Sequence, residues 1–295
     1  MSQHHRHHHD HDDDGAHMDW AQMATLLESQ AEVESPLYAE AADWLATLVP
    51  AVGVRRILDV GSGPGVLTSL LAEAFPAAEA VAVDGTAPLL ERARARAEAR
   101  GLGDRVSTLH AELPDAIGDL GEADLIWAGN SLHHIGDQRA ALAAFAERLR
   151  PGGLMVLIEG GLPGRHLPWN QGIGRPGLEA RLDVLNSERF GRMRAGLPDA
   201  KEEVDDWRAL LRAAGLTPAG TRTFLADAPA PVSPVVREQV VAHFERHRAV
   251  CDDQLADDDR AALDRLLDPA EPLSVHRRDD LFRLVARTVH TARKG

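Results

Sequence analysis

Two acidic residues and a pair of adjacent histidines carry the clearest chemistry in this chain of 295 residues. Asp59 opens the string Asp-Val-Gly-Ser-Gly-Pro-Gly, and Asp84 ends a later apolar run. A carboxylate such as Asp84 can accept hydrogen bonds from both hydroxyls of a ribose. His133 and His134 lie next to each other, and an imidazole exchanges a proton near neutral pH. These residue types suit the binding of a nucleoside and general base catalysis.

A strand, a glycine-rich turn and a helix must position these groups. Residues 57–60 are mostly apolar, which predicts the end of a parallel strand that is buried on both faces. Gly61, Gly63 and Gly65 follow at alternate positions, where they let the backbone turn sharply and approach a ligand closely. An apolar pattern with a helical period begins at Val66. This succession of elements is typical of a nucleotide-binding corner.

The spacing of the glycines restricts the kind of nucleotide. A dinucleotide fingerprint requires Gly-x-Gly-x-x-Gly, but its third glycine would be Val66 counted from Gly61 and Thr68 counted from Gly63. A P-loop fails as well, since no Gly-Lys-Ser/Thr follows. The remaining pattern, Asp-x-Gly-x-Gly-x-Gly, resembles motif I of the class I S-adenosylmethionine (SAM)-dependent methyltransferases. The resemblance implies that the loop runs under the methionine part of SAM and that Asp59 lies near its ammonium group.

Further motifs follow in the order and spacing of this family. Asp84 comes 23 positions after Gly61, close to the spacing of about 20 residues expected for an acid that binds the ribose. Glu112 ends the third predicted strand, where the family commonly has an acid that accepts a hydrogen bond from the adenine amino group, although Asp is more usual. Asn130 ends the fourth predicted strand, where backbone of the family touches SAM. The residues assigned to SAM binding are Asp59, Gly61, Ser62, Gly63, Gly65, Asp84, Gly85, Ala111, Glu112, Leu113 and Asn130.

The Leu-His-His run after the fourth strand is similar to that of trans-aconitate and quinone-biosynthesis methyltransferases. In the family this strand end lies beside the transferred methyl group, so His133 and His134 are the candidate catalytic residues. Adjacent residues usually point to different sides, and we therefore expect only one of them to act as a base. Packing, or a hydrogen bond to the backbone, is the alternative role for either histidine, and Glu159 is a weaker candidate base. The Asn-Pro-Pro-Tyr and Asp-Pro-Pro-Tyr motifs of enzymes that methylate nucleobase and glutamine amino groups are absent.

The sequence predicts an α/β fold with a Rossmann-like, seven-stranded and mostly parallel sheet. The resemblance implies the strand order 3-2-1-4-5-7-6, with an antiparallel seventh strand. Residues 19–50 are predicted to form an N-terminal helical lid, and residues 51–295 the SAM-binding domain, with insertions at about 161–200 and 230–280. The first insertion is expected to line the substrate pocket, because a loop at the carboxyl end of a strand faces the ligand; a flexible insertion without function is the alternative. The second suits a cap or a dimer surface equally, which leaves the oligomeric state open.

The composition limits the partners of the chain. The formal net charge of −14 argues against nucleic acid, whose binding proteins present a basic face. Aromatic residues make up only 4% of the chain, which disfavours a surface on which bases stack. Cys251 is the only cysteine, as expected in a reducing, cytoplasmic setting. No apolar run reaches about 18 residues, the minimum for a membrane span, so we expect a soluble protein.

The preferred function is SAM-dependent methyl transfer to a small organic acceptor, most often an oxygen nucleophile in similar enzymes, by in-line displacement. A SAM-binding protein that transfers no methyl group, either pericyclase-like or regulatory, is the alternative. Residues 1–18 are rich in histidine and aspartate, which could bind Zn²⁺ or Ni²⁺. A metal-handling function of this segment is a third possibility. A disordered tail or a purification tag is the simpler interpretation, and no functional metal site is expected.

Overall fold

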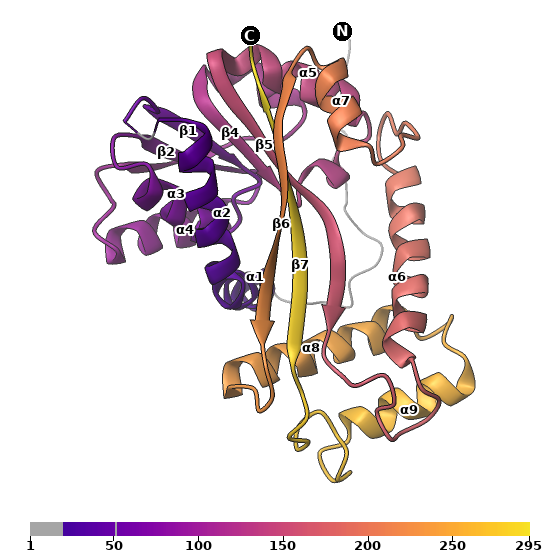
Figure 1. Ribbon diagram of the computed structural model, residues 1–295. Helices are drawn as coiled ribbons and strands as arrows, with labels where there is room; N and C mark the ends of the chain where they lie inside the picture. Colours follow the sequence, from indigo (N-terminus) through magenta and orange to yellow (C-terminus); the bar gives the residue numbers. More distant parts are fainter. Residues whose placement is uncertain (1–19, 51) are drawn as a thin grey trace, which may run out of the picture.

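The computed structural model describes residues 20–50 and 52–295. A seven-stranded sheet of order β3-β2-β1-β4-β5-β7-β6 forms its centre (Figure 1). β7 runs antiparallel to both β5 and β6, whereas the remaining neighbours are parallel. The predicted strand order and the antiparallel seventh strand are therefore confirmed. The histidine-rich segment 1–18 and the start of the predicted lid lie outside the described residues.

The elements follow one another in the alternating order typical of a doubly wound α/β fold. The strands are β1 (Arg56–Val60), β2 (Glu79–Asp84), β3 (Val106–His110), β4 (Ala123–Gly129), β5 (Leu149–Arg165), β6 (Thr217–Ala228) and β7 (Arg283–Arg293). The α-helices are α1 (Trp20–Val33), α2 (Ser35–Leu48), α3 (Val66–Ala74), α4 (Ala87–Ala99), α5 (Gln138–Arg148), α6 (Leu178–Ala195), α7 (Trp207–Ala213), α8 (Pro234–Val250) and α9 (Asp257–Leu267). Two short 3-10 helices are η1 (Asp115–Asp119) and η2 (Leu132–His134).

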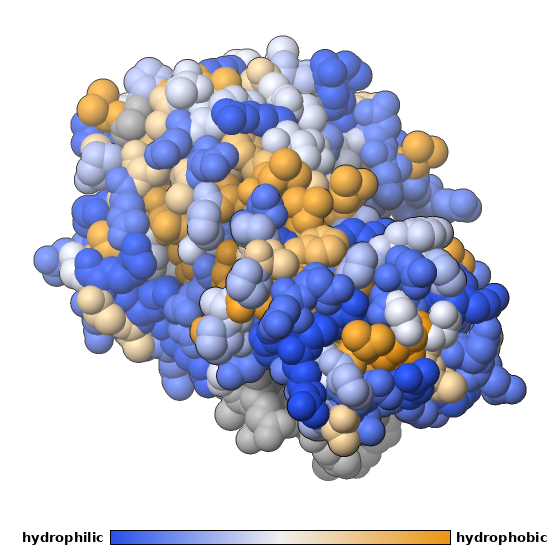
Figure 2. All heavy atoms as spheres, turned by 60° about the horizontal axis from the view of Figure 1, so that its bottom comes forward, coloured by the Kyte–Doolittle hydropathy of each residue, from blue (hydrophilic) through white to orange (hydrophobic). Residues whose placement is uncertain are grey.

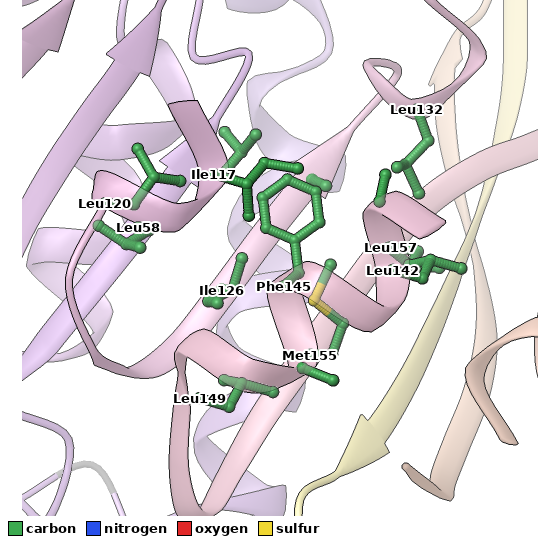
Figure 3. Close-up of a cluster of buried hydrophobic side chains, with 14 of the residues drawn as sticks. Leu58, Ile117, Leu120, Ile126, Leu132, Leu142, Phe145, Leu149, Met155 and Leu157 are labelled. Atoms are coloured by element: carbon green, nitrogen blue, oxygen red, sulfur yellow. The ribbon is translucent and has the colours of Figure 1, made fainter. Parts of the chain in front are cut away.

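Each face of the sheet is covered by its own apolar cluster, because successive side chains of a strand point to opposite faces. Ile126 and Ala128 of β4 pack on one face with α5 and α7, and Figure 3 shows this cluster around Phe145. Leu125 and Trp127 of the same strand pack on the other face, with α2 and α3. The central strands are thus held from both sides, which fixes the positions of their carboxyl ends.

β5, β6 and β7 extend far beyond the other strands and carry a group of helices at their far end (Figure 1). The sequence predicts that the fifth strand ends at Glu159, and this prediction is wrong. Pairing with β7 continues to Arg165, across irregularities on either side of Gly161. Gly161 has a φ of +118°, and a Cβ there would lie 2.2 Å from the carbonyl oxygen of Ala286. Glycine therefore permits a kink inside the strand, where the sequence pattern indicates a loop.

The segments predicted as two separate insertions share one buried core. We call residues 166–200 and 229–282 the helical extension; the first segment starts after β5, not at about residue 161. Its apolar core combines Leu178 and Leu182 of α6 with Val240 and Phe244 of α8. Arg181 of α6 also donates two hydrogen bonds of 2.7 Å to the buried carboxylate of Asp259 on α9. The two segments thus fold as one unit against the long strands.

The surface seen in Figure 2, with the helical extension brought forward, is hydrophilic over most of its area. Hydrophobic residues gather mainly in a band across the middle of this face. None of the helices in the described part of the chain combines the length and apolar character needed to cross a bilayer.

Candidate functional site

A cavity of about 630 Å³ opens at the carboxyl ends of β1, β2 and β4, with α1 and α2 contributing one wall. Seven residues expected from the sequence line it, namely Asp59, Gly61, Ser62, Gly63, Asp84, Asn130 and His134. Such a position is where ligands bind in open parallel sheets. Residues of α1 and α2, among them Gln30 and Tyr38, lie on the opposite wall.

The glycine turn is held against β2 and leaves room for a ligand. The backbone N–H groups of Gly61 and Ser62 both donate to the carbonyl of Val83, at 2.9 and 3.0 Å. Gly61 has a φ of +69°, and a Cβ there would lie 2.7 Å from Cβ of Ser131. Gly63 has a φ of +53°, but nothing lies within 4 Å of a Cβ built at this position. The turn therefore needs glycine for its conformation, and at Gly63 it faces open space.

Asp84 is oriented by the backbone around it. Its Oδ2 accepts a hydrogen bond from the N–H of Gly63 at 2.9 Å, and its Oδ1 accepts one from the N–H of Thr86 at 2.8 Å. Each carboxylate oxygen can accept more than one hydrogen bond. The carboxylate can therefore hold the glycine turn and still accept from a ribose.

Asp59 lies at the bottom of the cavity and is almost fully buried, with 2% of its surface exposed. Burial raises the pKa of Asp59 to about 7, and the charge of Asp84 adds to this effect. The hydroxyl of Thr68 donates a hydrogen bond of 2.6 Å to Asp59 Oδ2, which opposes the rise. A cationic group placed beside this carboxyl would favour its ionised form.

Five residues predicted to bind the cofactor are not in the wall of this cavity, namely Gly65, Gly85, Ala111, Glu112 and Leu113. All of them except Gly65 come after Asp84 in the sequence. The N–H of Ala111 donates to the carbonyl of Asp84 at 3.1 Å. A Cβ on Gly85 would lie 2.7 Å from Oε2 of Glu112, so this exposed carboxylate packs against the strand end. The role of Glu112 in adenine binding stays a prediction.

The two histidines occupy different environments in η2. His133 Nδ1 lies 3.1 Å from Oε2 of Glu159, whose other oxygen accepts hydrogen bonds from the N–H groups of Ser131 and Leu132. Glu159 is buried, so it anchors the turn from behind. His134 instead lines the cavity. Burial, followed by the neighbouring His133, lowers the pKa of His134 below its ordinary value.

Three buried polar atoms beside the cavity have no hydrogen-bond partner among the described residues. They are Oγ of Ser62, Oγ of Ser131 and Nε1 of Trp127. All three residues line the cavity. Buried polar groups are nearly always paired in folded proteins, so these atoms match the polar groups of a bound nucleoside and amino acid. The donors and acceptors present therefore fit SAM.

The wall of the cavity also contains an ionic cluster that the sequence motifs did not predict. Glu34, with 1% of its surface exposed, accepts hydrogen bonds from Arg283 at 2.6 Å and from Arg287 at 3.1 Å. Tyr38 donates to the other carboxylate oxygen at 3.1 Å. Burial alone would raise the pKa of Glu34, but the two guanidinium groups bring it below its ordinary value. The signal in the sequence was two arginines four positions apart, separated by three apolar residues in one strand, because such residues share one face.

Comparison with known proteins agrees with this site. Residues 57–153 match the sequence profile of a family described as a methyltransferase domain. The chain is 33% identical over 182 residues to a trans-aconitate 2-methyltransferase of Methylobacterium radiotolerans, covering 57% of this chain and 65% of that protein. It is 36% identical over 108 residues to a demethylmenaquinone methyltransferase of Thermus thermophilus, covering 36% of this chain and 47% of the relative. These matches and those to other relatives span 35% to 65% of the relatives' own lengths.

The solved structure of mitomycin 7-O-methyltransferase resembles the chain in fold. It aligns with a TM-score of 0.50 and 16% identity, over 94% of this chain and 59% of that one.

The sheet and the glycine turn define a Rossmann-like nucleotide-binding protein. More narrowly, residues 57–153 are a methyltransferase domain of the class I SAM-dependent type, whose cofactor is SAM.

We expect Asp84→Ala to weaken the binding of SAM by about 100-fold. The variant loses hydrogen bonds between a charged acceptor and the ribose, each worth about 1.5–3 kcal/mol, and a loss of about 3 kcal/mol corresponds to two orders of magnitude in affinity. Isothermal titration calorimetry with S-adenosylhomocysteine measures the effect. Asp104→Ala, at an exposed aspartate in a turn, is the matched control and should bind normally. An unchanged affinity in Asp84→Ala would remove the ribose assignment.

The affinity for SAM is expected to fall below pH 7, by up to about tenfold per pH unit. The pKa of Asp59 in the folded, ligand-free protein is raised to about 7, so this carboxyl holds a proton at lower pH. The cationic ammonium group of SAM favours the ionised form of Asp59, so this carboxyl must release its proton when SAM binds. Calorimetry in two buffers of different ionisation enthalpy counts the released proton. Asp59→Asn should bind more weakly at pH 8 and lose the pH dependence; a dependence identical to that of the wild type would exclude Asp59 as its origin.

Proposed function

We propose that the protein transfers the methyl group of SAM to an oxygen nucleophile of a small organic molecule, with His134 as the base. The observation that carries this proposal is the place of His134 in the wall of the cavity that also contains the glycine turn and both acids. When bound, SAM supplies a methyl group activated by the adjacent sulfonium. Since the pKa of His134 is lowered, its imidazole is neutral at pH 7 and can accept the hydroxyl proton of the acceptor.

The other residues of the site position and enclose the reactants. Glu159 holds the backbone of η2 through two N–H groups and His133 through its ring. α1 and α2 contribute side chains to the wall of the cavity. Alignment of two reactants in this way can correspond to an effective concentration on the order of 10⁵ M or more. No strong catalytic group beyond one base is needed for such a displacement.

The size and polarity of the cavity support a small, polar acceptor. Its volume of about 630 Å³ must hold SAM as well as the acceptor. The polar residues Gln30, Glu34, Tyr38 and Arg287 also line the cavity. The net charge of −14 speaks against a nucleic-acid acceptor. The single cysteine, Cys251, is buried and free, which supports a reducing compartment such as the cytoplasm.

Transfer of a labelled methyl group tests the proposal. The protein is incubated with methyl-labelled SAM and a heat-treated whole-cell extract. Label in the small-molecule, protein and nucleic-acid fractions is then measured together with S-adenosylhomocysteine. We expect label in a small molecule and an equal amount of S-adenosylhomocysteine. Label found only in protein or nucleic acid would contradict the proposed acceptor. Tight SAM binding without any S-adenosylhomocysteine would favour the alternative of a SAM-binding protein that transfers no methyl group.

A further inference from the structure

A group of metal-binding side chains lies in the helical extension, outside the proposed catalytic site. His166 follows β5, Glu179 is in the first turn of α6, and His243 is in the middle of α8. One ligand atom from each of the three residues lies within 4.8 Å of the other two. His166 is 4% and Glu179 8% exposed. We propose that these three residues bind a divalent transition-metal ion such as Zn²⁺, which ties α6 and α8 to the end of β5.

The carboxylate of Glu179 is already held in position by its surroundings. It accepts hydrogen bonds from the N–H of His166 at 2.9 Å and from the N–H of Leu167 at 3.1 Å. Its Oε1 also lies 3.0 Å from Nδ1 of His166. A carboxylate that contacts a histidine ring in this way either binds the metal ion directly or orients the imidazole that does.

Two imidazole rings lie together in this group. Each ring can offer one nitrogen to a metal ion. The rings of His166 and His243 lie 4.4 Å apart between centroids, which brings the two side chains together without a bond between them.

Space for a further ligand adjoins the group. A cavity of about 50 Å³ is lined by His166, His243 and Gln239 among others. This is enough for one water molecule, whose share of the liquid volume is about 30 Å³. Oε1 of Gln239, a residue with 9% of its surface exposed, has no hydrogen-bond partner among the described residues. This oxygen can accept a hydrogen bond from a metal-bound water.

The donor atoms of the group, two imidazole nitrogens and one carboxylate, favour a nitrogen-binding metal over Mg²⁺ or Ca²⁺, which prefer oxygen ligands. Arg246 and Arg283 also line the small cavity, and the charge of Arg283 is offset by its ion pair with Glu34. Glu179 supplies the negative charge of the site itself. We therefore expect one ion, bound mainly through imidazole nitrogen.

Titration of metal-free, full-length protein with Co²⁺ tests the proposal. A buried four-coordinate site should give strong visible absorption that saturates at one equivalent and disappears when Zn²⁺ is added. The histidines of residues 4–11 can also bind Co²⁺, but such binding would be unaffected by changes in the extension. His243→Ala should lose the strong band, and the control His276→Ala, at a single histidine elsewhere in the extension, should retain it.

Thermal unfolding gives a second readout that does not depend on absorption. Because an intact site exists only in the folded state, Zn²⁺ should raise the Tm of the wild type and of His276→Ala but not that of His243→Ala. Glu179→Gln, which keeps an oxygen acceptor for one of the two backbone donors, should fold and bind Co²⁺ at least tenfold more weakly. If the wild type shows neither the strong band nor a metal-dependent Tm, the three residues form a hydrogen-bonded group only. The same conclusion follows if all variants behave alike.

Discussion

Replacing His134 with alanine is expected to lower the rate of methyl transfer by about 10²–10⁴-fold, the usual contribution of a general base, while SAM binds as before. His134 lines the cavity but is not among the residues that orient the glycine turn, so the cofactor should be unaffected. Formation of S-adenosylhomocysteine measures the rate, and calorimetry measures the affinity. Full activity in His134→Ala would show that the acceptor is already ionised, as a carboxylate would be.

The pH dependence of the rate separates the two histidines. A base must be neutral, and burial together with His133 lowers the pKa of His134. With SAM saturating at every pH, the rate of the wild type should therefore be constant above about pH 6.5, the ordinary pKa of histidine, and fall only below it. His133→Ala should retain this acid limb, shifted to higher pH because a neighbouring positive charge is gone. His134→Ala should lose the limb altogether; its persistence would assign the base to another group.

Replacing Glu34 with alanine should lower the free energy of unfolding by about 3–5 kcal/mol, the usual cost of removing one partner of a buried ion pair. Glu34 is 1% exposed and neutralises Arg283 and Arg287. Without it, the buried guanidinium of Arg283 and the partly buried guanidinium of Arg287 would have no opposite charge beside them. Urea unfolding measures the loss.

A double variant identifies the origin of this loss. Glu34→Ala combined with Arg283→Met removes one of the unpaired charges and should be more stable than Glu34→Ala alone. Glu147→Ala, which removes an exposed ion pair at 3.9 Å, should cost no more than about 1 kcal/mol. If Glu34→Ala also lowered the free energy of unfolding by no more than about 1 kcal/mol, water would have ready access to the two arginines.

Local pattern was sufficient to predict the central part of the fold. The helical period after the glycine turn and the apolar strands ending in Asp84 and Asn130 correspond to elements of the structure. The length of β5 was not predictable in the same way. Gly160 and Gly161 read as a loop signal, but β7, more than 120 positions later, supplies the pairing that keeps this segment extended. Pairing between strands that are far apart in the chain is hard to recognise from a short stretch of sequence.

The same limit applies to the site. Asp59, Asp84 and His134 could be predicted because each lies next to its own strand end. Glu34 could not be predicted to contact Arg283, since the two residues are separated by 249 positions and meet only when β7 enters the sheet. His166 and His243 likewise lie on segments that form a common core only in the folded chain. Each of these contacts forms only when the whole fold is assembled, whereas a motif consists of residues that are close together in the sequence.

The position of β7 between β5 and β6 also bears on synthesis of the protein on the ribosome. The nascent chain emerges from its N-terminus, so β5 and β6 leave the exit tunnel before the strand that joins them. Until residues 283–293 follow, both strands have an unpaired edge, which favours aggregation. Arg283 and Arg287 arrive with that same strand. The cavity wall is therefore completed only when translation has passed residue 293, and a chain that stalls earlier is a natural client for chaperones.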